Sequence, residues 1–394
     1  MKHSIALLLL LAAPLLARAQ EPLINPEEGR TLLERVTPDG KAIPGASMNW
    51  QFYTSAGLYL TDGRLDEAAF KINQVRWEVL GTFAGNFSYH FRQSFNKTSN
   101  PYALDNLSSS IEYAFVRWDL LPRFALTAGK QIMQLGGYEY WVEAIKIREF
   151  SDFNNYLSCY QTGLTGTVTL SPTQQLNLQV LNSRNGSSSD AFLHGLPAGV
   201  QRAKVPLMAT ANWEGFFLPD RALNLRYSLS LGQAAQGRNL FYLTAGNVRK
   251  RGPLVAYVDL MYSREGLDSK GLVSDLTAAA DEEGGVTAQH VSYLTTIANV
   301  DYRVHPQWNV YVKGAYETAR VYRANGPYEA GLYRRTWNAQ ASVEFYPLKN
   351  SELFLFLHYL YRHRGLTQRA RALGGEAISQ QRVSLGLVYT IPVF

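Results

Sequence analysis

The sequence contains little cysteine and, after its first residues, no long apolar run. Cys159 is the only cysteine among 394 residues, so no intrachain disulfide can form. Its surroundings, NNYLSCYQTG, indicate a small buried hydrophobic residue rather than a nucleophile. After Gln20 no apolar run approaches the roughly 20 residues that a membrane-spanning helix needs. The sequence therefore excludes a disulfide-stabilised domain and a helical membrane protein.

Catalytic and ligand-binding motifs are also lacking. The histidines lie in strand patterns, as His90 does, or in tight turns, as His305 does, with no serine elbow or spaced ligand cluster around them. We therefore expect neither an enzyme nor a metal or other cofactor. The net charge of +6 becomes +4 without Lys2 and Arg18. Because the basic residues are interleaved with strand patterns rather than gathered in one patch, we expect no nucleic-acid partner.

The amino-terminal residues predict export. Lys2 is followed by the apolar run Ile5–Ala17 and by the small residues of ARA at Ala17–Ala19, which is the plan of a secretory signal peptide. We expect residues 1–19 to be removed and residues 20–45 to form a short periplasmic segment. No internal repeat is present, which argues against a propeller or a solenoid.

The feature that the sequence does have is alternation of apolar and polar residues. In LNLRYSLSL, Leu223–Leu231, leucines and a tyrosine take every second position, and asparagine, arginine and serines take the others. This period of two is typical of a β-strand with one apolar and one polar face. The same pattern recurs at residues 48–58, 74–79, 87–92, 175–180, 336–345 and 382–391. Although 46% of residues are hydrophobic, the mean hydropathy is −0.17.

The links between the strands alternate in length. Seven tight links, six of which contain proline, lie at residues 84–85, 121–123, 171–173, 218–220, 251–253, 305–307 and 347–350. Eight longer links, rich in Gly, Ser, Asn, Asp and Arg, lie near residues 61–68, 96–108, 132–158, 183–203, 233–238, 264–287, 323–333 and 363–381. Proline cannot continue a strand ladder and so marks the tight links.

This organisation predicts an all-β protein, a transmembrane antiparallel β-barrel of about 16 strands spanning residues 46–394. Outer-membrane barrels have short periplasmic turns and long external loops, whereas a soluble sandwich has no reason for such alternation. In this fold Leu225, Tyr227 and Leu229 face lipid, and Arg226 faces the water-filled lumen. Phe394 ends the chain in a strand, as in many outer-membrane barrels, and this ending predicts recognition by the barrel assembly machinery. Pro392 places Phe394 out of phase with the apolar positions of that strand.

Two stretches around the third long link carry a family resemblance. LTAGKQIMQLGGYEYW (Leu126–Trp141) and IREFSDFNNYLSCYQTG (Ile147–Gly163) resemble phosphate-selective porins of the O and P type, in particular a Bacteroidetes-like branch. The resemblance implies a trimeric porin of 16 strands whose third loop, residues 132–158, folds inward as a constriction.

The candidate functional residues are charges, because a passive pore needs width, water and an electrostatic field rather than a nucleophile. Charges in the lumen-facing phase are Arg76, Glu78, Arg92, Glu112, Arg226, Asp259, Lys313, Glu317, Glu344 and Arg382. The third loop adds Glu143, Lys146, Arg148, Glu149 and Asp152. Mixed signs predict weak selectivity that leans towards anions if the basic residues at the narrowest level dominate.

We therefore expect an outer-membrane porin of a Gram-negative bacterium for passive diffusion of small hydrophilic solutes, with a leaning towards phosphate-like anions. Its expected partners are membrane lipid, its solutes and two further copies in a homotrimer. Two alternatives stay open. One is a channel specific for a hydrophobic or oligomeric solute, and the other is a structural or adhesive barrel that uses its long loops.

Overall fold

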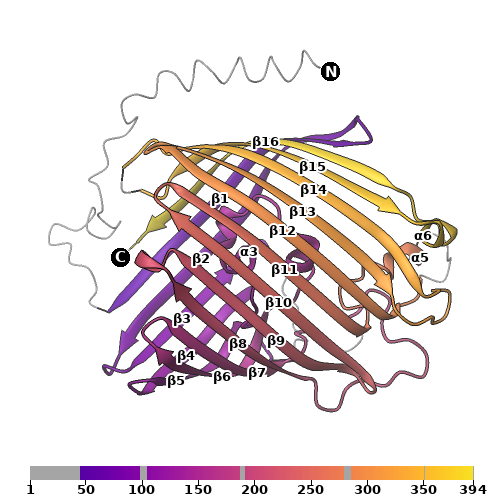
Figure 1. Ribbon diagram of the computed structural model, residues 1–394, viewed down its shortest axis with the longest axis horizontal. Helices are drawn as coiled ribbons and strands as arrows, with labels where there is room; N and C mark the ends of the chain where they lie inside the picture. The colour runs from indigo at the N-terminus through magenta and orange to yellow at the C-terminus, as the bar shows by residue number, and fades with distance from the viewer. Residues whose placement is uncertain (1–44, 98–103, 187–190, 279–284, 350, 394) are drawn as a thin grey trace.

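Sixteen antiparallel strands close into one barrel in the computed structural model, which describes residues 45–97, 104–186, 191–278, 285–349 and 351–393 (Figure 1). Each strand pairs with its neighbours in the sequence, and β1 closes the ring on β16. The predicted fold class and strand number are confirmed. The expected signal peptide, residues 20–44 and Phe394 lie outside the described residues.

The strands differ in length around the ring. The first eight are β1 (Ala46–Thr61), β2 (Arg64–Phe83), β3 (Phe87–Ser94), β4 (Ile111–Leu121), β5 (Phe124–Ile132), β6 (Tyr160–Ser171), β7 (Gln174–Asn182) and β8 (Leu207–Phe217). The second eight are β9 (Leu223–Ala235), β10 (Arg238–Arg251), β11 (Leu254–Leu267), β12 (Gln289–His305), β13 (Trp308–Val321), β14 (Gly331–Phe345), β15 (Phe354–Leu366) and β16 (Ile378–Pro392). Strands β3 to β8 have 8 to 12 residues and β9 to β16 have 13 to 17, so one side of the wall is lower.

The alternation of the sequence becomes the two faces of the wall. In β9 the side chains of Tyr227 and Leu229 are exposed on the outer surface, whereas Ser228 and Ser230 are buried inside. Ser228 bonds to Thr244 of β10 at 2.6 Å on the inner face. The structure thus has the predicted register, with apolar residues outside and polar residues towards the lumen.

Two of the predicted long links are tight turns instead. β1 and β2 are joined by Asp62 and Gly63 alone, and β9 and β10 by Gln236 and Gly237. Asp62 and Gly63 have φ values of 49° and 80°, and positive φ at both central residues suits a two-residue hairpin turn because its twist matches that of the strands. The strands therefore continue through residues that the sequence pattern assigned to loops. Conversely, residues 346–353 form a longer link than predicted.

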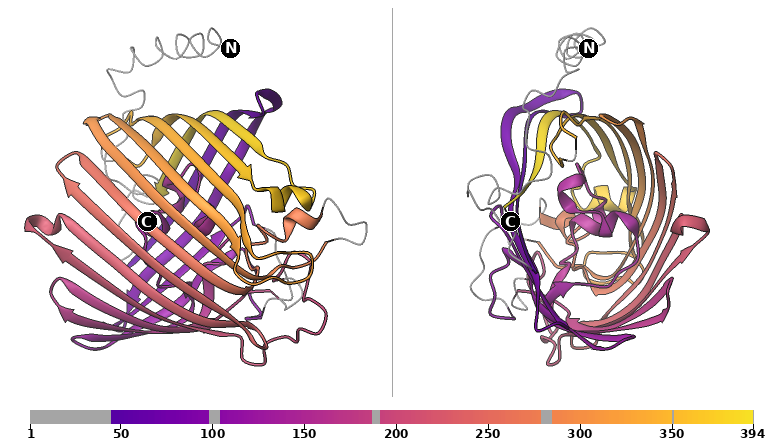
Figure 2. Two further views of the ribbon diagram at one scale, coloured as in Figure 1. Left: turned by 45° about the vertical axis from the view of Figure 1, so that its right-hand side comes forward. Right: turned by 90° about the vertical axis from the view of Figure 1, so that its left-hand side faces the viewer.

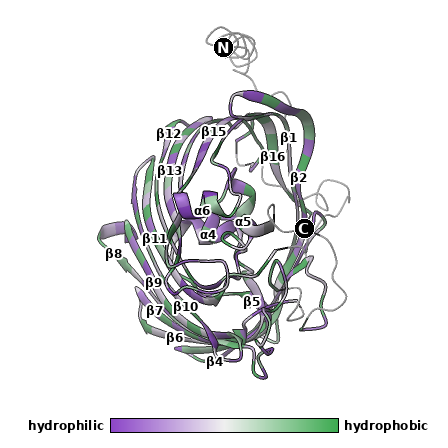
Figure 3. Ribbon diagram, turned by 90° about the vertical axis from the view of Figure 1, so that its right-hand side faces the viewer, coloured by the Kyte–Doolittle hydropathy of each residue, from purple (hydrophilic) through white to green (hydrophobic). Residues whose placement is uncertain are grey.

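Five short helices lie in the long links of the described residues: α3 (Tyr138–Trp141), η1 (Ala144–Lys146), α4 (Asp152–Asn155), α5 (Asp275–Ala278) and α6 (Gln368–Ala372). A further turn, η2 (Pro219–Arg221), lies in the tight link between β8 and β9. None of the helices in the described part of the chain is long and apolar enough to cross a membrane. Viewed from the end that carries α5 and α6, the helices α4, α5 and α6 lie within the outline of the ring of strands (Figure 3).

Candidate functional site

The link between β5 and β6, residues 133–159, crosses the interior of the barrel and is called the inner loop below. It begins with Gly136 and Gly137, whose backbone lies directly on the wall. The Gly136 N–H donates to Ser228 Oγ at 3.0 Å and to Thr244 Oγ1 at 2.6 Å. A Cβ at Gly136 would lie 2.6 Å from the carbonyl oxygens of Arg226 and Thr244, and Gly137 has a φ of +91°. Only glycine fits here, which explains the GG step.

A wall carboxylate holds the first helical turn of the inner loop. The backbone N–H groups of Tyr138 and Glu139 donate to the two carboxylate oxygens of Asp259 at 2.7 and 2.8 Å. These are N–H groups that α3 itself cannot satisfy, so Asp259 takes the place of a capping residue. Asp259, which the sequence predicts as a lumen-facing charge, therefore holds the backbone of the inner loop and does not face free solvent.

Glu139 lies at the centre of the loop and is fully buried. Its carboxylate accepts from Lys313 Nζ at 2.7 Å, from Ser151 Oγ at 2.6 Å and from Asn154 Nδ2 at 2.6 Å. Burial raises the pKa of Glu139, but the charge of Lys313 and the hydrogen bonds outweigh it, so the pKa lies below its ordinary value. Glu139 joins the two helical turns of the loop to β13.

The other acidic residues of the loop pair with wall arginines. Glu149 contacts Arg362 at 2.7 Å and Arg382 at 3.0 Å. Asp152 pairs with Arg334, and its backbone N–H donates to Glu317 at 2.6 Å. The predicted residues Glu149, Asp152, Glu317 and Arg382 are thus brought together, and they join the loop to β13, β14, β15 and β16.

Sequence reasoning missed Arg334 and Arg362. Both lie in the lumen-facing phase of clear strands: Arg334 is two positions before Thr336, and Arg362 is four positions after His358. The alternation of Thr336–Phe345 would have placed Arg334 inside, had it been extended by one step.

Arg148 has an unusual environment for a charged side chain. It is 4% exposed, and none of its three guanidinium nitrogens has a hydrogen-bond partner among the described residues. Its guanidinium carbon lies 4.7 Å from the ring centre of Tyr53, 5.2 Å from that of Phe354 and 4.6 Å from that of Phe356. Cation–π contacts of this kind are favourable but leave the N–H donors unused.

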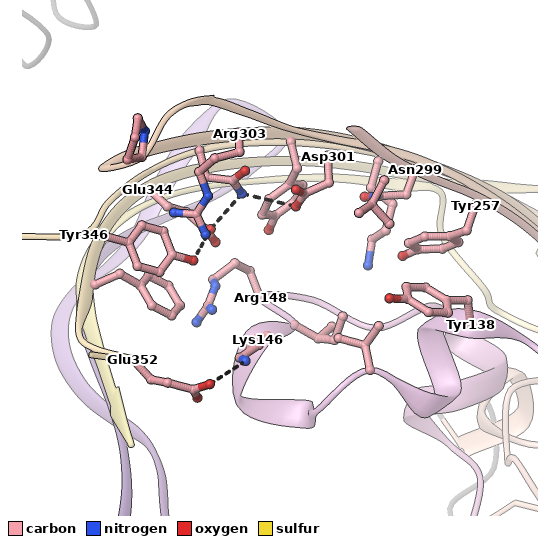
Figure 4. A pocket seen from close by; sticks show the side chains of 18 of the residues that line it. Tyr138, Lys146, Arg148, Tyr257, Asn299, Asp301, Arg303, Glu344, Tyr346 and Glu352 are labelled. Carbon is pink, nitrogen blue, oxygen red and sulfur yellow. Dashed lines mark hydrogen bonds and ion pairs between the residues drawn. The ribbon is translucent and has the colours of Figure 1, made fainter. Parts of the chain in front are cut away.

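The side chain of Arg148 borders a cavity of about 840 Å³ at the short-turn end of the barrel (Figure 4). Lys146 lies at the same cavity, exposed, with Glu352 at 3.3 Å and Glu143 at 3.6 Å. The cations of the lining are Lys146, Arg148, Arg303, Lys313 and Lys349, and its carboxylates are Asp301, Glu344 and Glu352. The lining therefore carries more positive than negative groups.

A second charged cluster lies on the inner face of β2, β3 and β4. Glu112 is fully buried and contacts Arg76 at 3.0 Å, Arg92 at 2.8 Å and Lys97 at 2.8 Å. Glu78 contacts His90 at 2.6 Å on the same wall. The predicted inward residues Arg76, Glu78, Arg92 and Glu112 all lie here and form one connected group of ion pairs. On β9, Arg226 pairs with Glu214 at 2.6 Å and lies over the ring of Trp141.

Sixteen strands, an apolar outer face and a polar interior crossed by a loop define a porin-type barrel. The chain belongs to the family of phosphate-selective porins O and P, whose model matches residues 48–391. It is an outer-membrane porin of the Gram-negative type and serves passive diffusion.

Solved structures share the fold at low sequence identity. The outer-membrane channel DcaP of Acinetobacter baumannii is 11% identical, with a TM-score of 0.60 over 88% of this chain and 96% of that one. An anion-selective porin from Comamonas acidovorans is 11% identical, with a TM-score of 0.57 over 88% and 99%. OmpT of Vibrio cholerae is 10% identical, with a TM-score of 0.52 over 89% and 99%. No curated protein matches the sequence.

Proposed function

We propose that this porin conducts small hydrophilic solutes with a preference for anions, and that the inner loop forms its constriction. The observation that carries the proposal is the guanidinium of Arg148, which borders the cavity with its hydrogen-bond donors unused. The guanidinium charge lies beside the cavity, so it attracts an anion that passes through it.

The pairing of the other loop charges supports this preference. Glu139, Glu149 and Asp152 each contact a wall lysine or arginine, so their negative charges are balanced locally. Arg148 has no acidic partner within ion-pair distance among the described residues. The field that a solute meets beside the loop is therefore more positive than the composition of the loop suggests.

The proposal is tested by replacing Arg148 with glutamine and measuring reversal potentials in planar bilayers under a salt gradient. A unit charge at 4 Å contributes about 1 kcal/mol even at the dielectric constant of water, and a difference of this size is roughly fivefold in a permeability ratio. We expect the anion-to-cation permeability ratio of Arg148→Gln to fall by at least about that factor. Lys146→Ala should act in the same direction but less strongly, because Lys146 is exposed and lies beside Glu352 and Glu143.

Arg369→Ala is the matched control, since Arg369 is an exposed cation on α6 that pairs with Glu329 away from the cavity. An unchanged reversal potential for an open Arg148→Gln channel would contradict the proposal. An equal shift in the control would show that the effect is not local.

We also propose that the channel is a homotrimer and that it transports its solute without chemical conversion. OmpT of Vibrio cholerae, 10% identical with a TM-score of 0.51, has been solved in a trimer form, which supports the first of these proposals. The second is supported by membership of a porin family. Masses of the detergent-solubilised protein from light scattering test the trimer directly.

A further inference from the structure

A second cavity, of about 210 Å³, lies between the inner loop and the wall formed by β8, β9 and β10. The inner loop lies within the ring of strands (Figure 2, right). Residues 183–186 and 191–192 of the link between β7 and β8, with Ser269 of the link between β11 and β12, line the cavity at the end that carries the long links. We call it the β8–β10 cavity. It shares no lining residue with the cavity beside Arg148.

Much of the lining of the β8–β10 cavity is apolar, although the inner face of the barrel is mostly polar. Met208 and Tyr242 lie on β8 and β10, where the next inward positions are Thr210 and Thr244. The large apolar side chains of the lining come from the inner loop, the β7–β8 link and the wall, and they are Met133, Leu157, Phe192, Met208, Leu240 and Tyr242.

The size of the cavity is sufficient for a small organic molecule. An apolar cavity of about 150 Å³ stays dry and binds benzene. The β8–β10 cavity, at about 210 Å³, therefore has room for a six-membered ring and one further small group. Tyr156 of the lining is 39% exposed, so the cavity is connected to solvent.

One cation, Arg184, borders this apolar lining. Its Nη1 donates to the carbonyl of Gly186 at 2.7 Å, and its Nε has no hydrogen-bond partner among the described residues. Burial and the charge of Arg202 lower the pKa of Arg184, and no carboxylate of the described residues acts in the opposite direction. Because Arg184 is only half-buried, its guanidinium can be reached by a ligand. A bound anion would supply the missing negative charge.

The residues on both sides of Arg184 are held in place. Ser183 Oγ donates to the carbonyl of Gln233 on β9 at 2.7 Å. Asn185 Nδ2 donates to Ser158 Oγ of the inner loop at 3.1 Å and to the carbonyl of Tyr160 at 2.8 Å. The backbone of Arg184 is therefore fixed beside the cavity before a ligand arrives, which reduces the entropy lost on binding.

One class of ligand suits both parts of the lining. An inorganic anion would pair with Arg184 but would gain nothing from the apolar side chains. A hydrocarbon would gain from burial but would leave the cation without a partner. Ligand sites in proteins commonly combine an apolar lining with a few polar groups that orient the ligand. A small carboxylate with an apolar body satisfies the cation and the apolar lining together.

We propose that the β8–β10 cavity binds a small organic anion, with its carboxylate against Arg184 and its apolar body among Met133, Phe192 and Leu240. The inference goes beyond the anion-preferring pore, because binding at this cavity involves neither Arg148 nor conduction. Such a site retains one class of solute at the end of the barrel that carries the long links.

Binding of radiolabelled benzoate to the detergent-solubilised full chain, measured by equilibrium dialysis, tests the inference. We expect Arg184→Gln to weaken binding at least about fivefold, the effect of one unit charge at contact distance even in water. Ala191→Phe should abolish binding, because Ala191 lines the cavity from a link and the larger side chain fills it. The matched controls are Arg371→Gln and Ala372→Phe, since both residues are exposed on α6 and lie outside the cavity. Both should bind benzoate as the wild type does.

A series of straight-chain carboxylates tests the apolar part of the site. From acetate to butyrate to hexanoate, competition with benzoate should strengthen by about fourfold for each CH₂ that is buried. Inorganic phosphate at the same concentrations should not displace benzoate.

Four results would overturn the inference. The first is a wild-type protein that binds no benzoate, and the second is binding that survives both Arg184→Gln and Ala191→Phe. The third is equal competition by acetate, hexanoate and phosphate, which would show a site that recognises charge alone. The fourth is binding lost in Arg148→Gln but kept in Arg184→Gln, which would place the ligand in the other cavity. None of the first three results bears on the reversal potential of Arg148→Gln, so the anion preference of the pore is tested separately.

Discussion

Replacing Glu139 with alanine should release the inner loop while the barrel stays closed. The Glu139 carboxylate is fully buried and its partner Lys313 is 4% exposed, so the change leaves a buried cation without its partner. Breaking one side of a buried pair costs about 3–5 kcal/mol, far more than the 0–1 kcal/mol of a surface pair. That free energy corresponds to roughly a hundredfold to several thousandfold more opening of the loop.

Hydrogen exchange of the detergent-solubilised protein measures this opening. We expect amides in residues 136–156 to exchange at least about a hundredfold faster in Glu139→Ala, including the Ser151 amide that donates to Glu139 at 3.1 Å. Amides of β12 and β13 should keep their protection, since the pairing of these strands does not involve Glu139.

The control is the double variant Glu139→Gln with Lys313→Met, which removes both charges together. Its effect should be smaller than the sum of the effects of Glu139→Gln and Lys313→Met alone, because each single variant leaves one buried charge without its partner and the double variant leaves none. Unchanged loop exchange in Glu139→Ala, or strictly additive single effects, would refute the reasoning.

The pKa of Glu139 gives the sign of a pH effect on the same loop. Its pKa in the folded protein lies below the ordinary value of 4.5. The ionised carboxylate therefore contributes its full stabilisation above about that pH, and the contribution is lost as the pH falls through the lowered pKa. Loop exchange, corrected for the intrinsic effect of pH, should increase only in acid, and in Glu139→Gln this increase should disappear.

Two further predictions concern the barrel itself. Leu229→Arg puts a charge on the lipid face and should lower the free energy of unfolding in lipid vesicles by about 2–4 kcal/mol if position 229 lies near the midplane of the bilayer. Leu229→Ile should leave this free energy nearly unchanged. Equal urea midpoints of unfolding for the two variants would contradict the outward orientation of Leu229. An epitope inserted after Gly326, where the chain has open space around it, should be reached by antibody on intact cells, and one inserted after Gly252 only once the outer membrane is breached; the opposite result would invert the barrel.

The barrel could be predicted from the sequence because the alternation that defines each strand lies within that strand's own residues. Period-two alternation places each residue of β9 inside or outside without knowledge of any other strand. The error at Asp62 and Gly63 has a local cause as well: polar residues near a turn were assigned to a loop, although DG is a strong signal for a two-residue hairpin.

The partners of the charges could not be predicted, because they depend on contacts between distant parts of the chain. Lys313 and Glu139 are 174 residues apart, and Arg362 and Glu149 are 213 residues apart. Alternation shows that Lys313 faces inward, but only the path of the inner loop decides that it meets a carboxylate. Arg148 illustrates the same limit, since its three aromatic neighbours come from β1 and β15.

The contacts of the inner loop with the wall have a mechanical consequence. The loop is joined to β9 and β10 through Gly136, to β11 through Asp259, to β13 through Lys313, and to β15 and β16 through Glu149. It therefore acts as a strut across the cross-section and resists flattening of the cylinder under the lateral pressure of the bilayer. A barrel without the inner loop should therefore become more elliptical, so deleting the loop would change the outline of the pore as well as remove an obstruction from it.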